Sequence, residues 1–179
     1  MPFDGANIWV ANSGDDTVAK LRASSGAVLG TYSTGDAPSA LAFDGTNVWV
    51  ANSGDNSVTK LKASDGSLAG NYTTAIDNPE GIAFDGTNIW IANFDADNVT
   101  KLLASNGSLI GSHAVADSLA GLCFDGTNIW VANSGTNTVS KLKASDGSVV
   151  GTYSLGDTPA GIASTAAPSG LSSTVIIPC

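Results

Sequence analysis

The sequence predicts an all-β propeller, and three observations support this prediction. A Phe-Asp-Gly marker recurs at Phe3, Phe43, Phe84 and Phe124, at intervals of 40, 41 and 40 residues. The text that follows each marker is nearly the same in all four copies. Each copy consists of short β-branched and aromatic runs separated by Gly, Asn and Asp, which are typical of strands and tight turns. A repeat of this length and composition is characteristic of a propeller blade.

The second copy shows how one blade is built. We expect four strands, over residues 38–43, 47–52, 58–63 and 68–73. The first of these is small and apolar on both faces, as expected for the innermost strand between two neighbouring blades. The Asp-Gly turn that follows it suits a hairpin, because these residues tolerate positive φ. Four antiparallel strands of this kind make one blade.

The largest apolar side chain of each copy is a tryptophan in the middle of the second strand. We expect these four residues to pack between blades, where large aromatic side chains dominate a core; a ring of ligand-stacking aromatics is the alternative. They are Trp9, Trp49, Trp90 and Trp130. A lysine recurs on the third strand, and we expect its stem to pack while its ammonium reaches solvent or a nearby carboxylate. These lysines are Lys20, Lys60, Lys101 and Lys141.

The ends of the repeat region suggest how the ring closes. Residues 159–163 repeat the innermost strand once more, whereas only Met1 and Pro2 precede the first marker. We therefore expect residues 159–163 to pair with residues 6–12 and complete the first blade, which removes an exposed sheet edge. Three arrangements remain open: a closed ring of four blades, a fragment of a longer propeller, and a homo-oligomer in which two chains build a ring of eight blades.

Residues 1–163 are predicted to form the propeller, with repeats that start near the four markers. Residues 164–179 are rich in Ser, Thr, Ala and Pro and carry no period, so we expect an irregular tail or linker. Residues 175–177 could form a short strand within it.

Composition narrows the function classes. The chain has 179 residues, of which 42% are hydrophobic, so it can form a core rather than remain disordered. Its formal net charge of −9 opposes binding to the phosphate backbone of nucleic acids and favours cationic or basic partners. There is no apolar run long enough to span a membrane. The acidic, Lys-poor composition, rich in Ser, Thr and Asn, favours an extracellular or cell-surface location.

The two cysteines give little indication of a disulfide. Cys123 takes the position that Ala42 and Ala83 hold in other copies, so we expect it to be a small buried residue. Cys179 ends the irregular tail. A bridge between them is an open alternative that the spacing does not support.

The repeat layout resembles that of bacterial NHL/YVTN propeller proteins, and of the streptogramin lyase (virginiamycin B lyase) family in particular. The likeness runs from Phe3 to about Ala163, and PEGIAFDGTNIWIANFDADNVTKL illustrates it. It implies a propeller that opens a cyclic antibiotic by elimination, with a histidine base and a Mg²⁺ ion held by carboxylates. Lyase repeats typically end the tryptophan strand with Glu, whereas these positions are Asn12, Asn52, Asn93 and Asn133.

The single histidine, His113, aligns with tyrosines of the other copies, on the outermost strand. We therefore expect His113 to take the place of a tyrosine. We assign none of the lyase family's catalytic residues to this chain. Lyase activity would require His113 and Glu80, the only glutamate, to meet in one pocket.

The acidic residues cluster in two sets of loops that should share one face of the disc. These loops connect the second and third strands of each blade, and cross from one blade to the next. Ten of the sixteen acids fall there: Asp15, Asp16, Asp36, Asp55, Asp77, Glu80, Asp95, Asp97, Asp117 and Asp157. Asp and Asn shape turns through hydrogen bonds to the backbone. Carboxylates also suit Ca²⁺, so calcium is the one cofactor that we consider.

The third repeat departs most from the others, because Phe94-Asp95-Ala96-Asp97 replaces the usual Ser-Gly-Asp turn. Phe94 should be an exposed aromatic beside acids, and such divergence on one face can mark a binding site. We therefore expect a non-catalytic binding or scaffold module that holds a protein or small ligand on its acidic loops. A lyase-like enzyme and a purely structural assembly protein are the alternatives.

Overall fold

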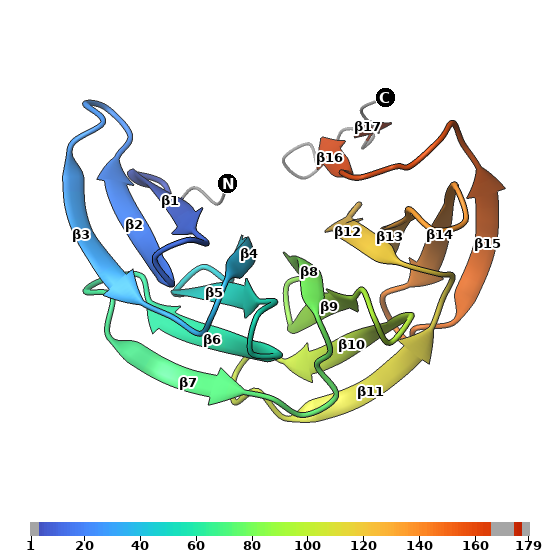
Figure 1. Ribbon diagram of the computed structural model, residues 1–179, viewed down its shortest axis with the longest axis horizontal. Helices are drawn as coiled ribbons and strands as arrows, with labels where there is room; N and C mark the ends of the chain where they lie inside the picture. Colours follow the sequence, from blue (N-terminus) through green and yellow to red (C-terminus); the bar gives the residue numbers. More distant parts are fainter. Residues whose placement is uncertain (1–3, 166–173, 177–179) are drawn as a thin grey trace.

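The computed structural model describes residues 4–165 and 174–176, and this part of the chain consists of strands joined by turns and loops (Figure 1). Within these residues, no helix is long and apolar enough to span a membrane. The first sheet comprises β1 (Asn7–Asn12), β2 (Thr17–Arg22) and β3 (Val28–Ser33). The second comprises β4 (Pro38–Phe43), β5 (Asn47–Asn52), β6 (Ser57–Lys62) and β7 (Leu68–Tyr72).

The next two sheets repeat this plan. The third comprises β8 (Pro79–Phe84), β9 (Asn88–Asn93), β10 (Asn98–Leu103) and β11 (Leu109–Ala114). The fourth comprises β12 (Leu119–Phe124), β13 (Asn128–Asn133), β14 (Thr138–Lys143) and β15 (Val149–Ser154). All neighbouring strands within these sheets pair antiparallel. The predicted propeller blades are therefore confirmed, with the second blade's strands placed within one residue of expectation.

The four blades follow one another along an arc (Figure 1). Strands β4, β8 and β12 lie on its inner side, and β3, β7, β11 and β15 form its outer rim. β1 contacts β4, β4 contacts β8, and β8 contacts β12. The two ends of the arc are β1 and the short strand β16 (Ala163–Thr165), which contacts β12.

The predicted closure of the first blade is wrong in this structure. In the described part of the chain, the first sheet has three strands, and β1 pairs with β2 alone. Instead of meeting residues 6–12, β16 pairs with β17 (Thr174–Ile176), so a short local hairpin takes the place of the long-range pairing. We expected residues 164–179 to be irregular apart from a short strand at 175–177, and β17 overlaps that strand at residues 175 and 176. Cys179 and Ile177 lie outside the described residues; Cys123 is free and buried, as predicted.

The hydrophobic core lies between the blades. One cluster joins Trp9 of the first blade to Val48, Val50 and Leu61 of the second. Equivalent clusters surround Trp49 at the next junction and Trp90 at the one after. Trp9, Trp49 and Trp90 have no exposed surface, which confirms the prediction that these tryptophans pack between blades.

Each junction also carries a polar and aromatic contact that we call the latch: the tryptophan, the third-strand lysine and the outer-strand ring of one blade. The ammonium lies over the tryptophan of its own blade, at 5.2 Å for Lys20, 4.6 Å for Lys60 and 4.8 Å for Lys101. It donates a hydrogen bond to a backbone carbonyl of the next blade. These bonds are 2.6 Å to Ala63, 2.7 Å to Ala104 and 2.8 Å to Ala144. The expectation that these ammonium groups reach solvent or carboxylates is therefore wrong for the three lysines, because burial makes the next blade's carbonyl the available acceptor.

The outer-strand ring completes the latch. Tyr32 lies 5.7 Å from Trp9, ring centroid to ring centroid, and the other blades repeat this ring contact. The same ring packs over a glycine of the next blade's turn, so a side chain on Gly66 would collide with Tyr32. We call this Ala-Ser-x-Gly turn the receiving turn.

The aspartate of each Phe-Asp-Gly marker braces its own blade. In the third blade, Asp85 accepts hydrogen bonds from the backbone amides of Thr87 and Asn88, at 2.9 and 2.7 Å, and from Trp90 Nε1 at 2.7 Å. Burial alone would raise the pKa of Asp85, but these hydrogen bonds lower it overall. The predicted turn role is confirmed, and the aspartate in addition orients the tryptophan.

A first prediction concerns the close approach of the inner strands. A Cβ on Gly81 would lie 2.9 Å from Gly121 Cα and 3.0 Å from Leu122 N, both backbone atoms that cannot move aside cheaply. We expect Gly81→Ala to lower the free energy of unfolding by about 1–3 kcal/mol, the usual cost of overpacking. The matched control is Gly121→Ala, whose nearest neighbour is Ala160 O at an ordinary 3.6 Å. Equal effects in urea unfolding of the two variants would contradict the packing described here.

A second prediction concerns acid stability. Because the pKa of Asp85 is depressed in the fold, its contribution is present above its ordinary pKa of 3.8 and is lost as pH falls through the folded value. Asp85→Asn should lower the free energy of unfolding by about 1 kcal/mol at pH 7, allowing for solvent screening, and by much less near pH 2. The control is Asp15→Asn, at an exposed residue. A loss that is independent of pH would show that charge is not involved.

Candidate functional site

The arc of blades has two faces, one at each end of the strands, and they differ in the charged residues that they carry. One face, which we call the acidic loop face, holds the turns at 13–16, 53–56, 94–97 and 134–137 and the crossovers at 34–37, 74–78, 115–118 and 155–158. Backbone hydrogen bonds tie turns to crossovers, as from Ser53 N to Ala37 O at 3.1 Å and from Phe94 N to Asn78 O at 2.9 Å. The ten acidic residues predicted to share a face lie in these segments or, for Glu80, at the start of β8 beside them.

The opposite face, which we call the turn face, holds the Phe-Asp-Gly turns and the receiving turns. Ala63 N donates to Thr46 O at 3.0 Å, which joins the two kinds of turn within a blade. The six other acids lie there. All seven Lys and Arg residues lie in the last three residues of the third strands or directly adjoin them, toward this face: Lys20, Arg22, Lys60, Lys62, Lys101, Lys141 and Lys143. The acidic loop face therefore carries ten carboxylates and no Lys or Arg.

Some of these carboxylates shape the loops. Asp16 and Asp97 accept hydrogen bonds from the backbone amides of Ala37 and Ser118, each at 2.8 Å. Both aspartates have positive φ, at 54° and 51°, as Asp and Asn tolerate better than most residues. Asn56 and Asn137 take the same part in the second and fourth blades. The turn-forming interpretation of these positions is therefore supported by direct contacts.

Five other aspartates of this face accept hydrogen bonds from side chains, and two accept none from the described residues. Asp55 accepts a 2.6 Å hydrogen bond from Ser57, and Asp77 and Asp95 each accept a 3.2 Å bond from an asparagine. Asp117 and Asp157 make similar local contacts at 3.2 and 3.5 Å. Among the described residues, no hydrogen bond reaches the exposed side chains of Asp15 and Asp36.

No group of three or more His, Cys, Asp and Glu side chains in the described part of the chain is arranged to hold a metal ion. Calcium binding on this face stays a prediction.

A hollow of about 290 Å³ lies at the divergent third repeat. Its lining includes Asn78, Glu80, Phe94, Ala120 and Ala160. Glu80 is half-buried, and burial and then the neighbouring charge of Asp95 raise the pKa of its carboxyl. Phe94, expected to be exposed, is half-buried, because its ring forms one wall of this hollow. The structure thus brings together three predicted site residues: Glu80, Phe94 and Asp95.

Glu80 also borders a second hollow of about 460 Å³, lined in part by Ser39 and Ser53. Sequence reasoning missed this arrangement, although a signal for it exists. Ser39, Glu80, Ala120 and Ala160 take the same place in their repeats, the second residue of the innermost strand or its equivalent. A charged residue occurs there only in the third repeat.

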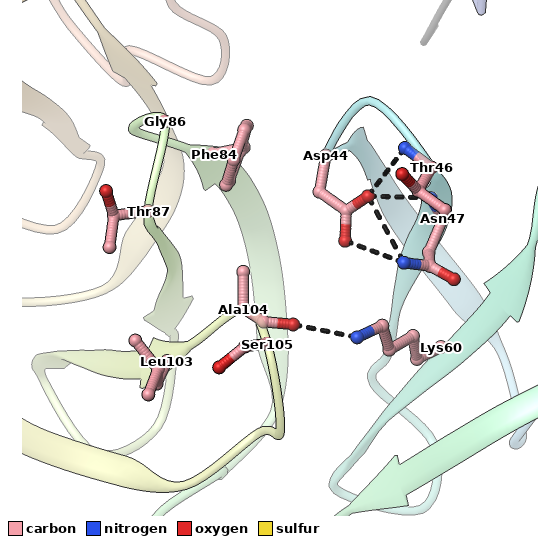
Figure 2. Close-up of a pocket in the computed structure, with 10 residues that line it drawn as sticks. All are labelled: Asp44, Thr46, Asn47, Lys60, Phe84, Gly86, Thr87, Leu103, Ala104 and Ser105. Carbon is pink, nitrogen blue, oxygen red and sulfur yellow. Dashed lines mark hydrogen bonds between the residues drawn. The ribbon is translucent and has the colours of Figure 1, made fainter.

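A further cavity, of about 440 Å³, opens on the turn face between the second and third blades (Figure 2). Its two charged side chains, Asp44 and Lys60, are already hydrogen-bonded within the protein. Asp44 accepts hydrogen bonds from Thr46 N and Asn47 N at 2.9 and 2.6 Å, and Lys60 donates one to Ala104 O across the blade junction. Burial would raise the pKa of Asp44, but hydrogen bonds from Trp49 and Asn47 lower it overall. We therefore interpret this cavity as part of the blade junction.

His113 takes the place of a latch tyrosine. Its ring lies 5.7 Å from that of Trp90, and a side chain on Gly147 would collide with it. Burial and then the charge of Lys101 lower the pKa of His113. It lies on β11, whereas Glu80 lies on β8, at the opposite edge of the same sheet. The structure does not bring His113 and Glu80 together in one pocket.

No protein-family model matches this sequence, and no curated protein matches it. Solved structures match its fold. The structure of U3-55K superposes with a TM-score of 0.80 at 18% identity, over 89% of this chain and 52% of that chain. The crystal structure of RRP9 WD40 repeats gives 0.79 at 18% identity, over 89% and 51%. A streptogramin B lyase structure gives 0.74 at 18% identity, over 87% and 54%. The chain thus spans about half the length of these structures, and at such identity the likeness shows the propeller fold alone.

A third prediction concerns Glu80. Because burial and Asp95 raise its pKa, the ionised carboxylate destabilises the fold, and this effect grows as pH rises through the folded pKa. Glu80→Gln should raise the free energy of unfolding at pH 7, by less than about 1 kcal/mol after solvent screening, and leave it unchanged at pH 3. Thermal unfolding at the two pH values measures this. A loss of stability at pH 7 would contradict it.

Proposed function

We propose that this propeller is a non-catalytic binding or scaffold module that holds a basic partner, a cationic protein segment or small ligand, on its acidic loop face. The observation that carries the proposal is the separation of charge, with ten carboxylates and no Lys or Arg on this face. Like charges gathered on one surface create a field that attracts and orients an oppositely charged partner. A basic partner is therefore the best chemical match.

Glu80 and Phe94 give this face a focus. A half-buried aromatic ring beside a partly desolvated carboxylate suits a cation with an apolar stem, such as an arginine or lysine side chain. The hollow of about 290 Å³ between them is large enough for one such side chain rather than for a whole folded partner. We therefore place the principal contact of the partner at the third repeat.

An elimination enzyme of the lyase type is the less favoured alternative, because His113 and Glu80 lie at opposite edges of one sheet. Propellers host many functions, so the likeness to the lyase and WD40 structures does not choose between them. A bacterial NHL/YVTN-type origin and an extracellular or cell-surface location are further parts of the proposal and rest on repeat layout and composition. Calcium bound by the loop carboxylates is a subsidiary proposal.

A calorimetric titration with an acetylated tetra-arginine peptide tests the proposal. The loop-face variant Asp15→Asn/Asp36→Asn and the turn-face variant Asp65→Asn/Asp146→Asn both change the net charge from −9 to −7, since each removes two carboxylates. We expect the loop-face variant to weaken binding about three- to tenfold and the turn-face variant to leave it nearly unchanged, because screening limits charge effects to the nearby face. Equal weakening in both variants would overturn the assignment to this face.

Phe94→Ala tests the focus at the third repeat in the same titration. We expect Phe94→Ala to weaken binding more than the loop-face variant does. The size of this loss should not change with salt concentration, because the substitution removes no charge. Unchanged binding by Phe94→Ala would place the partner elsewhere on the acidic loop face. A parallel titration with CaCl₂ alone tests the calcium proposal, and no heat above dilution at millimolar concentration would refute it.

A further inference from the structure

The three blade junctions use one interface, and at the ends of the arc its two halves have no partner among the residues that the structure describes. At every junction, a latch from one blade packs on the receiving turn of the next, as Lys20 and Tyr32 pack on Ala63 and Gly66. The fourth blade carries a latch of its own. Its members are Trp130, Lys141 and Tyr153.

The latch of the fourth blade is complete but uncovered. Lys141 lies 4.9 Å above Trp130, and Tyr153 lies 5.8 Å from it, as in the other blades. Yet Trp130 is half-buried where the other three tryptophans have no exposed surface, and Tyr153 is 47% exposed. No hydrogen bond from the Lys141 ammonium to any described residue replaces the carbonyl contact of the other lysines.

The first blade offers the matching half. Its receiving turn, Ala23-Ser24-Ser25-Gly26, has the same glycine with positive φ, at 69°, as Gly66 at 74°. Among the described residues, no atom lies within 4 Å of a Cβ built on Gly26, whereas a Cβ on Gly66, Gly107 or Gly147 would collide with a latch ring. Ile8 and Val10, which correspond to the fully buried Val48 and Val50, are half-buried.

Backbone groups at the two ends match as well. Residues 159–162 run beside β12, with Ala160 O 3.6 Å from a Cβ built on Gly121, and thus take the place of an innermost strand. Their chain continues into β16, which pairs with β17, and within the described part of the chain residues 159–162 pair with no strand. At the other end, among residues 4–165 and 174–176, β1 pairs only with β2 and has no innermost strand beside it.

We propose that two copies of this chain dock head to tail, so that the fourth blade of each receives the first blade of the other. Lys141 of one copy then donates to Ala23 O of the other, and Tyr153 covers Gly26. By the register of β4 with β5, Pro159, Gly161 and Ile162 pair with Asn12, Ala11 and Val10. The predicted completion of the first blade thus occurs between copies rather than within one chain.

The shape of the arc favours a closed ring over an open filament. Its two ends lie on the same side of the arc (Figure 1), and the chain matches about half the length of the WD40 propellers. Two such arcs give a ring of eight blades, within the range of about 4–8 that propellers use. The ring has twofold symmetry and two equivalent junctions, which stops further growth. This inference does not depend on the proposed partner of the acidic loop face.

Light scattering across a hundredfold concentration range tests the proposal. We expect a mass of twice 17.8 kDa for the chain as it stands. Gly26→Asn should give a folded single chain, because Asn tolerates positive φ and the site is open within one copy, while its side chain would strike Tyr153 of the other. The control is Gly45→Asn, also at positive φ in open space but outside the junction, which should keep the double mass.

A second variant makes the test independent of the first. Lys141→Met should weaken association at least tenfold, because it leaves Ala23 O without its donor and removes the contact over Trp130. A mixture of the Gly26→Asn and Lys141→Met chains contains pairs in which one of the two junctions is intact. We expect this mixture to recover part of the double mass that neither variant forms alone.

Three results would overturn the proposal. One is a single-chain mass at every concentration, which would point to an occupant from outside these 179 residues. Another is a double mass that survives in both variants, which would mean a different interface. The third is a mass that grows without limit, which would mean an open filament. Tryptophan emission that shifts to shorter wavelength as the chain associates, and not in Gly26→Asn, would support burial of Trp130.

Discussion

The contact between neighbouring blades is the interaction on which the rest of the structure depends. A single four-stranded sheet has two apolar faces and cannot bury either by itself, so each blade is stable only when its neighbours cover it. The tryptophans are the largest side chains buried there. Burying one removes about 150–250 Å² from water, worth roughly 4–6 kcal/mol as an upper estimate at 25 cal/mol per Å².

The lysine of the latch contributes less free energy than the tryptophan, but it fixes the position of one blade relative to the next. A cation over an aromatic ring contributes about 0.5–2 kcal/mol, and a hydrogen bond from a charged donor a comparable amount. Its buried ammonium, however, must find an acceptor, and the carbonyl of Ala63, Ala104 or Ala144 is in reach only when two blades meet in one register. The tryptophan therefore drives the packing, while the lysine and the ring over the receiving glycine fix how the blades sit.

Because these contacts lie between the blades and on the turn face, the residues of the acidic loop face can vary more freely. The turn face is committed to the brace of Asp85 and its counterparts and to the receiving turns. The acidic loop face needs only a side-chain oxygen that caps each crossover, a part that Asp16, Asn56, Asp97 and Asn137 all fill. Charge and shape can change elsewhere on this face without loss of the fold. The third repeat does so, with a glutamate and an aromatic ring where the other repeats have small residues.

The sequence by itself determined the blade: its four strands, its turns, the tryptophans between the sheets and Cys123 as a small buried residue. These features follow from local patterns repeated four times, so each copy confirms the reading of the others. Only the tertiary structure decided which contacts cross between blades. It showed that lysines bond to carbonyls 43 or 44 residues away, that Glu80 and Phe94 line one hollow, and that residues 159–163 do not pair with residues 6–12 in one chain. The physical reason is that near-identical repeats present near-identical edges, so local sequence cannot specify which of them meet.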